Sequence, residues 1–175
     1  SPRSLYVVSG SVECDPGAEV LRDRLYLNKG NGDFEKAEGS LPDNRFSGSV
    51  VAACDFDHDG DLDLFVGGRV VPGEYPVTPT SSLLQNRGDG TFEDVTRQVS
   101  PELAQGGLVT SALWSDVNSD AWQDLLVVNE WGPVSVYINK NGKLVRQNNE
   151  STGFGKTTGW YNGIDGRDLD GDGDI

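Results

Sequence analysis

Short apolar runs separated by polar turns dominate the pattern of this chain. Two pairs of such runs lie at 49–54 and 62–66, and at 108–114 and 125–128. Runs of this length, rich in Val, Leu and aromatic residues, predict buried strands. No segment shows a helical period, and the strongest candidate is a single capped turn at 100–103. The pattern therefore predicts an all-β chain.

A second pattern lies between the pairs and recurs at 25–34, 83–92 and 136–144. Each copy has an apolar run, an Asn, a Gly-containing turn and a further apolar position. This order predicts a β-hairpin. One full unit therefore reads strand, polar loop, strand, connection, strand, turn, strand.

The polar loops carry oxygen-bearing side chains at alternate positions. Counted from its first Asp, each loop uses positions 1, 3 and 5, and the first two loops also use position 9. The candidate metal ligands are Asp55, Asp57, Asp59, Asp61 and Asp63; Asp116, Asn118, Asp120, Trp122 and Asp124; and Asp168, Asp170, Asp172 and Asp174. Position 7, occupied by Asp61, Trp122 and Asp174, is expected to contribute its backbone carbonyl.

This ligand pattern favours calcium, which takes six to eight oxygen ligands. Closely packed carboxylates repel one another unless a cation lies among them. The alternative is that the loops are solvated acidic turns, because Asp and Gly favour turns without a metal. Three copies in one register favour the metal.

The individual loops differ in ways that affect the expected affinity. Gly60 supplies the turn residue at position 6, whereas Ala121 would be strained at a positive φ. Neutral Asn118 at position 3 predicts weaker binding by the second loop. His58 lies at an even position and is expected to point into solvent. An EF-hand is excluded, because Val66 stands where the bidentate Glu would be and strands flank the loop.

The repeat of this unit predicts β-propeller blades, each a four-stranded antiparallel sheet with a calcium loop between its first two strands. The loops start 61 and then 52 residues apart. The predicted division is a partial blade at 1–46, blades at 47–105 and 106–157, and the start of another at 158–175. The chain is expected to be a fragment of a larger propeller, completed by further blades or by self-association.

The calcium loops, together with the stretches 66–72, 129–133 and 159–163, resemble the FG-GAP/VCBS repeat family. Blades of this family also form the integrin α-subunit head, and the stretches resemble long secreted bacterial members, some related to cartilage acidic protein. The resemblance implies a seven-bladed propeller in an extracellular, cell-surface or periplasmic protein. It implies no particular ligand, because one fold serves many functions.

Composition limits the partners and the compartment. The formal net charge is −14, and twelve of the 28 acidic residues lie in the loops. Such acidity excludes nucleic acid as the expected partner, and no apolar run is long enough to span a membrane. Cys14 and Cys54 could form a disulfide in an oxidising compartment or remain free.

The predicted function is adhesion or binding of a glycan or protein, with calcium as a structural cofactor. Trp131 and Trp160 are candidate contacts because exposed aromatic rings stack on ligands, although packing between blades is an alternative. Tyr75 lies in the long Pro-containing connection at 71–80, where function often concentrates. A single histidine argues against an enzyme. A calcium-dependent polysaccharide lyase or hydrolase and a purely architectural repeat remain the alternatives.

Overall fold

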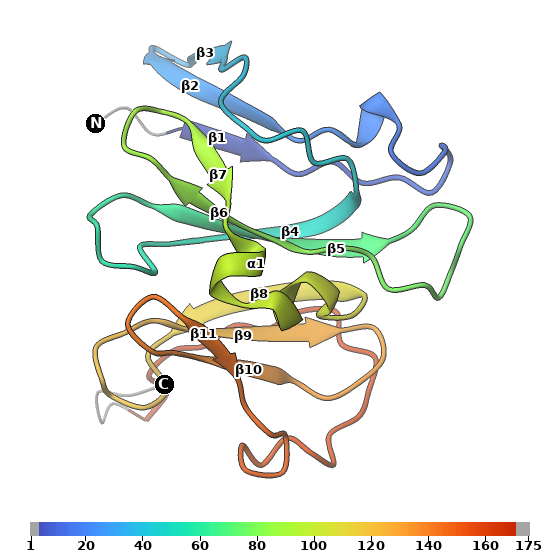
Figure 1. Cartoon of the computed structure of the whole chain (residues 1–175), viewed down its shortest axis with the longest axis vertical. Helices are drawn as coiled ribbons and strands as arrows, with labels where there is room; N and C mark the ends of the chain where they lie inside the picture. Colours follow the sequence, from blue (N-terminus) through green and yellow to red (C-terminus); the bar gives the residue numbers. More distant parts are fainter. Residues whose placement is uncertain (1–3, 171–175) are drawn as a thin grey trace.

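The computed structural model describes residues 4–170, which form three antiparallel sheets stacked along the chain (Figure 1). The first sheet contains β1 (Ser4–Val7), β2 (Arg24–Gly30) and β3 (Asp33–Lys36). The second contains β4 (Ser47–Cys54), β5 (Asp63–Val70), β6 (Ser82–Asn86) and β7 (Phe92–Asp94). The third contains β8 (Val109–Ser115), β9 (Asp124–Asn129), β10 (Ser135–Asn139) and β11 (Leu144–Arg146).

These sheets confirm the all-β prediction and have the form of propeller blades. In the second and third sheets the strands lie side by side in chain order, and every pairing is antiparallel. In both, the Asp-rich loop joins the first strand to the second. The predicted hairpins form the last two strands of each sheet.

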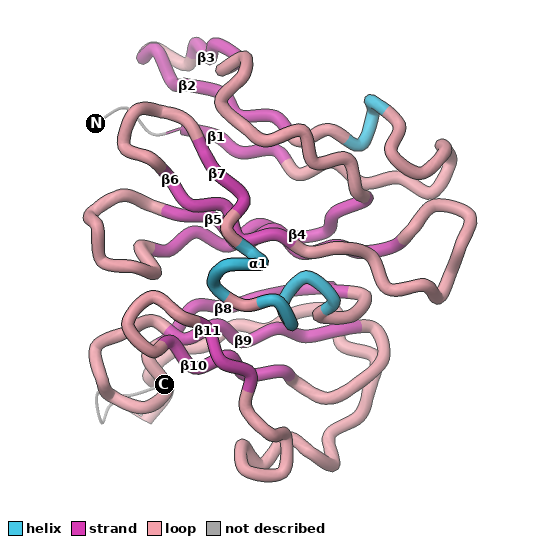
Figure 2. The backbone as a smooth tube through the Cα atoms, in the orientation of Figure 1, coloured by secondary structure: helices cyan, strands magenta, loops and turns pink. Residues whose placement is uncertain are grey.

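Helix is confined to short segments (Figure 2). They are α1 (Thr96–Val99) and the 3-10 turns Glu19–Leu21 and Pro101–Gln105. The prediction of one capped turn was incomplete, since α1 precedes it, and Ser100 makes no side-chain cap bond. A helix of one turn is too short to show an apolar period, which explains the omission.

Strand register places equivalent residues at the base of the two loops. Cys54 pairs with Asp63 across β4 and β5, and Ser115 pairs with Asp124 across β8 and β9. The position-9 Asp is thus the first residue of the second strand in both sheets. Each loop is therefore closed by a strand pair, which limits how far its two ends can separate.

β5 is buried on both faces, and its side chains alternate between two cores. Phe65 belongs to the core between the second and third sheets, with Leu125 and Tyr137. Leu64 and Val66 belong to the core between the first and second sheets. Because successive strand residues point to opposite faces, a strand between two sheets reads as a continuous apolar run.

Side chains also connect neighbouring sheets through hydrogen bonds. The Ser49 hydroxyl donates to the Val109 carbonyl at 2.7 Å, and Trp114 Nε1–H donates to the Ala52 carbonyl at 3.2 Å. Trp114 therefore contributes to packing between the second and third sheets.

Within residues 4–170, no helix is long and apolar enough to cross a membrane. Cys14 and Cys54 are free thiols, and the Cys54 side chain is buried. Burial raises the pKa of Cys54 to about 12, with a further contribution from the Asp55 and Asp63 charges.

Asp94 at the end of β7 holds the connection into α1 and the segment before β4. Its carboxylate accepts the Thr96 N–H at 3.0 Å, the Ser82 hydroxyl at 2.9 Å and the Asn44 amide at 3.0 Å. Burial alone would raise the pKa of Asp94, but these hydrogen bonds outweigh it, and the pKa lies below its usual value.

A depressed pKa makes the Asp94 contribution depend on pH. The carboxylate stabilises the fold above its unfolded pKa of about 3.9, and this stabilisation is lost as the pH falls through the lower folded pKa. We expect Asp94→Asn to lower the melting temperature at pH 6 and to have a much smaller effect near pH 3. Thermal melts of both proteins at these two pH values measure the difference, and an equal effect at both would contradict the assignment.

Candidate metal centre

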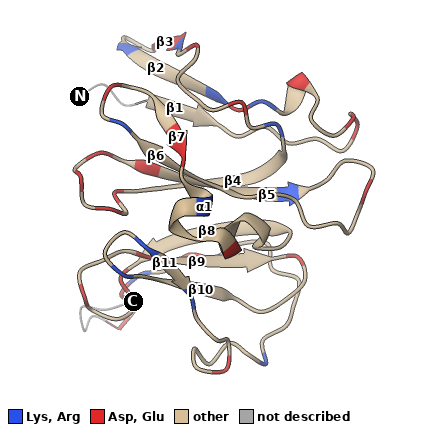
Figure 3. Ribbon diagram, viewed as in Figure 1, with Lys and Arg blue, Asp and Glu red and all other residues tan. Residues whose placement is uncertain are grey.

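The loop 55–62 and the start of β5 bring three carboxylates together. Asp55, Asp57 and Asp63 each place one carboxylate oxygen within 4.8 Å of the others. Asp63 is fully buried, whereas Asp55 and Asp57 are partly exposed. In Figure 3 acidic residues mark this loop and the loop between β8 and β9. Three oxygens at this separation could hold one divalent cation.

Local hydrogen bonds explain why alternate residues turn inward. The Gly60 N–H donates to Asp55 Oδ2 at 3.1 Å, and the Asp61 N–H donates to Asp59 Oδ1 at 2.9 Å. His58 and Gly60 have φ values of 62° and 94°. Left-handed residues at these two positions tighten the turn, as the glycine at position 6 predicts.

One oxygen of this group lacks any hydrogen-bond partner. Asp55 Oδ1 is buried and accepts no hydrogen bond from the described residues. A buried carboxylate oxygen without a donor is costly. A cation bound between Asp55 and its neighbours would satisfy it, so the residues present fit a metal.

The electrostatics of Asp63 also fit a bound cation. Its carboxylate accepts the Asn86 N–H at 2.8 Å and the Phe56 N–H at 3.2 Å. Burial nevertheless raises its pKa to about 7, and the charges of Asp57 and Asp59 add to the rise. A bound cation would favour the ionised form of all these groups.

The loop 116–123 repeats the same backbone arrangement. The Ala121 N–H donates to Asp116 Oδ2 at 2.7 Å, and the Trp122 N–H donates to Asp120 Oδ1 at 2.9 Å. Ala121 adopts a φ of 69°, which is the strained conformation expected from the sequence. Asp124 is buried, and burial raises its pKa above the usual value.

The second loop differs from the first at position 3, where Asn118 replaces an Asp. Among residues 4–170, the cluster of three close carboxylates occurs in the first loop and not in the second. Weaker calcium binding by the second loop therefore stays a prediction.

The remaining predicted ligands are less closely grouped. Asp59 is outside the three-carboxylate cluster, and the Asp61 side chain lines a neighbouring cavity. Asp168 and Asp170 are exposed near the end of the described chain. Asp172 and Asp174 lie outside the described residues. The backbone-carbonyl role of position 7 stays a prediction.

His58 is exposed, as the sequence predicted, but it also makes a contact that the sequence did not predict. Its ring stacks on Trp122 of the second loop, with ring centroids 4.0 Å apart and an interplanar angle of 14°. The two Asp-rich loops of adjacent sheets are therefore in direct contact. Sequence analysis treated the loops separately, and only the stacking of the sheets brings positions 58 and 122 together.

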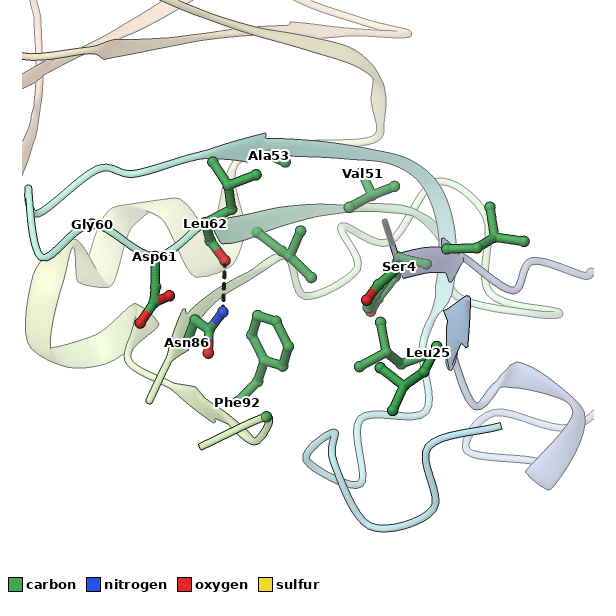
Figure 4. A pocket seen from close by; sticks show the side chains of 14 residues that line it. Ser4, Leu25, Val51, Ala53, Gly60, Asp61, Leu62, Asn86 and Phe92 are labelled. Atoms are coloured by element: carbon green, nitrogen blue, oxygen red, sulfur yellow. Dashed lines mark hydrogen bonds between the residues drawn. The ribbon is translucent and has the colours of Figure 1, made fainter. Parts of the chain in front are cut away.

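Two asparagines that support the loops were not recognised from the sequence. Asn86 donates its backbone N–H to Asp63, and its side chain donates to the Leu62 carbonyl at 3.3 Å (Figure 4). Asn139 is fully buried; its N–H donates to Asp124 Oδ1 at 2.7 Å. The sequence did contain a signal for these residues, because an Asn recurs at the equivalent position of all three predicted hairpins.

Asn139 also reaches the loop of the preceding sheet. Its side-chain amide donates to the Phe56 carbonyl at 2.7 Å and to the Gln123 carbonyl at 3.1 Å. One side chain thus contacts both Asp-rich loops. The first Asp-rich loop is therefore supported by the hairpin of the next sheet.

A cavity of about 580 Å³ lies beside the first loop, between the first and second sheets (Figure 4). Apolar side chains such as Leu25, Val51 and Phe92 form most of its wall, and Asp61 is the charged residue among the described residues that line it. One carboxylate in an apolar wall does not make a second metal site.

The three predicted ligand-contact residues also come together. Trp131 Nε1–H donates to the Tyr75 hydroxyl at 2.7 Å, and Trp131 packs against Trp160 with ring centroids 4.9 Å apart. These residues come from three separate segments of the chain. Tyr75 and Trp131 lie in the connections that follow β5 and β9, at the ends of those strands opposite the Asp-rich loops, whereas Trp160 lies after β11.

The fold and loops together define a class of protein: a β-propeller-type repeat module with Asp-rich loops between the first two strands of its blades. A family model described as an FG-GAP-like repeat matches residues 6–66 and 116–175, well over half of the chain. The chain therefore belongs to the FG-GAP-like repeat family, as the sequence resemblance indicated. A search among curated proteins found no match.

Proposed function

We propose that this chain is a calcium-binding propeller module of an extracellular, cell-surface or periplasmic protein, and that it binds a glycan or protein ligand. The observation that carries the calcium proposal is the Asp55, Asp57 and Asp63 cluster, in which a buried Asp55 oxygen lacks a hydrogen-bond partner. A compartment with millimolar calcium suits exposed loops of this kind.

Calcium has a structural role in this proposal. The loop joins two strands that run between the cores, and its carboxylates repel one another when no cation is bound. Calcium would hold the loop closed, and the His58–Trp122 stack and the Asn139 bonds would pass that restraint to the neighbouring sheet. The chain then presents its other surfaces on a rigid support, which suits binding rather than catalysis.

Thermal unfolding with 2 mM calcium, with 2 mM magnesium and with excess EDTA tests this proposal. A single site at a calcium concentration of about 100 times its Kd adds roughly 2.7 kcal/mol of stability. For a domain of this size that corresponds to a rise of roughly 5–11 °C in melting temperature.

Magnesium is the matched control, because its strict octahedral geometry and reluctance to lose water suit this loop poorly. We expect a much smaller shift with magnesium than with calcium. Identical melting temperatures in calcium and EDTA would show that the loops are acidic turns without a metal, and would overturn the calcium proposal.

A further inference from the structure

A hydrogen-bonded aromatic surface lies at the opposite end of the strands from the metal centre. We define it by Arg69, Tyr75, Glu130, Trp131 and Trp160. In Figure 1 the 71–81 connection (green) leaves β5 at the end opposite the loop that joins β4 to β5. The aromatic surface and the candidate metal centre are therefore separate sites.

A chain of polar contacts fixes the rings in place. Trp131 Nε1–H donates to the Tyr75 hydroxyl at 2.7 Å, and that hydroxyl donates to Glu130 Oε1 at 3.0 Å. The other Glu130 oxygen pairs with the Arg69 guanidinium. Glu130 is only 3% exposed, so an ion pair with a buried carboxylate anchors the whole arrangement.

Backbone bonds hold Trp160 against this group, although it follows the third sheet in sequence. The Gly159 N–H donates to the Gly132 carbonyl at 3.2 Å, and the Tyr161 N–H donates to the Asn129 carbonyl at 3.2 Å. Trp131 and Trp160 meet at an interplanar angle of 58°. The orientation of both indole rings is thus set before any ligand arrives.

The rings are fixed in orientation but are not buried by the described residues. Tyr75, Trp131 and Trp160 are 53–55% exposed among the described residues. By contrast, Trp114 lies between sheets and donates its N–H across them. Rigid, half-exposed aromatic rings beside a polar network are typical of ligand sites, because little entropy is lost on binding.

We infer that this aromatic surface binds a neutral pyranose unit of a glycan. The apolar face of a sugar ring would stack on the exposed parts of the indole rings. Its hydroxyl groups would reach the Tyr75 hydroxyl and the guanidinium N–H groups that Glu130 leaves free; Arg69 is 31% exposed. This inference rests on the proposed binding function and names its site and ligand class.

The charge of the site favours a neutral sugar over an acidic one. Glu130 compensates the only cation of the surface, Arg69, and the whole chain carries a formal charge of −14. A sulfate or uronate group would find no uncompensated positive charge here. Trp131 and Trp160 also contact each other directly, so they do not form an open cage around a quaternary ammonium group.

The size of the surface argues against a protein partner. Each ring can bury 150–250 Å², so three half-exposed rings offer roughly 240–400 Å². A stable protein interface needs about 800 Å² on each partner. One or two sugar rings match the available area better.

An array of immobilised oligosaccharides, probed in 2 mM calcium, tests the inference. The array contains neutral glucans, mannans, galactans and chitin oligosaccharides, together with sulfated and uronic-acid oligosaccharides. We expect retention on at least one neutral class. Trp131→Ala and Trp160→Ala should each weaken that binding at least tenfold, as measured by titration with the soluble oligosaccharide.

Phe34→Ala is the matched control, because Phe34 is an aromatic residue with 49% exposure on β3, in another sheet. It should bind the glycan like the unmodified chain. The inference is overturned by retention of acidic oligosaccharides alone, by the absence of retention on every neutral class, or by equal losses in Phe34→Ala and the tryptophan variants.

Calcium-dependent melting of the same variants separates this inference from the proposed function. Trp131→Ala and Trp160→Ala should keep the full calcium shift, because the metal centre lies at the other end of the strands. A calcium shift without glycan binding overturns only the glycan site. Glycan binding without a calcium shift overturns only the calcium proposal.

Discussion

Asp63→Ala is expected to lower the free energy of unfolding in 2 mM calcium by about 4–6 kcal/mol. Asp63 is fully buried and accepts the N–H groups of Phe56 and Asn86. The buried Phe56 N–H would lose its acceptor at a cost of about 1–3 kcal/mol, whereas the part-buried Asn86 N–H can bond to water instead. The change also removes a proposed calcium ligand, and with it roughly 2.7 kcal/mol of metal-linked stability.

The expected loss is smaller in EDTA. Without a cation the buried Asp63 charge is itself unfavourable, as the rise of its pKa to about 7 shows, and alanine removes that charge. Urea unfolding of both proteins in calcium and in EDTA measures the two losses. Equal losses in the two conditions would show that Asp63 supports the fold but binds no calcium.

Asp61→Ala provides the matched control, since it removes an identical charge from the same loop. The Asp61 side chain lines the neighbouring cavity and is outside the three-carboxylate cluster. If position 7 contributes only its backbone carbonyl, this variant keeps the calcium shift. A loss of the shift as large as that of Asp63→Ala would contradict the predicted ligand arrangement.

Asn139→Ala is expected to destabilise the chain by about 3 kcal/mol. Asn139 is fully buried, and its side chain donates to the Phe56 and Gln123 carbonyls and accepts the Gly142 N–H at 2.9 Å. Alanine leaves these groups without their partner in a buried site. Because the bonds reach both Asp-rich loops, we also expect a smaller calcium shift.

The equivalent asparagines form a graded control series. Asn86 donates a side-chain bond of 3.3 Å to Leu62 in its own loop and accepts the Gly88 N–H at 3.0 Å, whereas the Asn28 side chain accepts the Gly30 N–H of its own turn at 2.8 Å. We expect Asn86→Ala to cost about 1 kcal/mol and Asn28→Ala no more than about 0.5 kcal/mol. Urea unfolding of the three variants gives the order, and equal effects would show that contact with the loops contributes nothing beyond the turn.

Together these contacts tie the candidate metal centre to the packing of the sheets. The first loop meets the second through the His58–Trp122 stack and meets the third sheet through Asn139. A cation in the first loop would therefore stabilise the contact between two sheets as well as its own strand pair. This arrangement gives a physical reason why calcium bound in an exposed loop would raise the stability of the whole fold.

The arrangement of residue types within short segments was sufficient to predict the strands and the oxygen-rich loops. The apolar runs predicted the strands, because a strand buried on both faces, such as β5, needs continuous apolar residues. Alternating oxygens from Asp55 to Asp63 predicted the clustering of carboxylates, because a tight turn directs alternate side chains inward. The strain at Ala121 followed from the absence of glycine at position 6.

The tertiary structure decided what lies next to each loop. The stacking of His58 on Trp122, the reach of Asn139 to Phe56, and the meeting of Tyr75, Trp131 and Trp160 join residues from different sheets or connections. Such contacts depend on how sheets stack, whereas the hydrophobic period specifies only which residues are buried within a strand. The sequence by itself therefore determined the strands and the oxygen-rich loops, and only the packing of the sheets determined which loops support one another and where the aromatic surface forms.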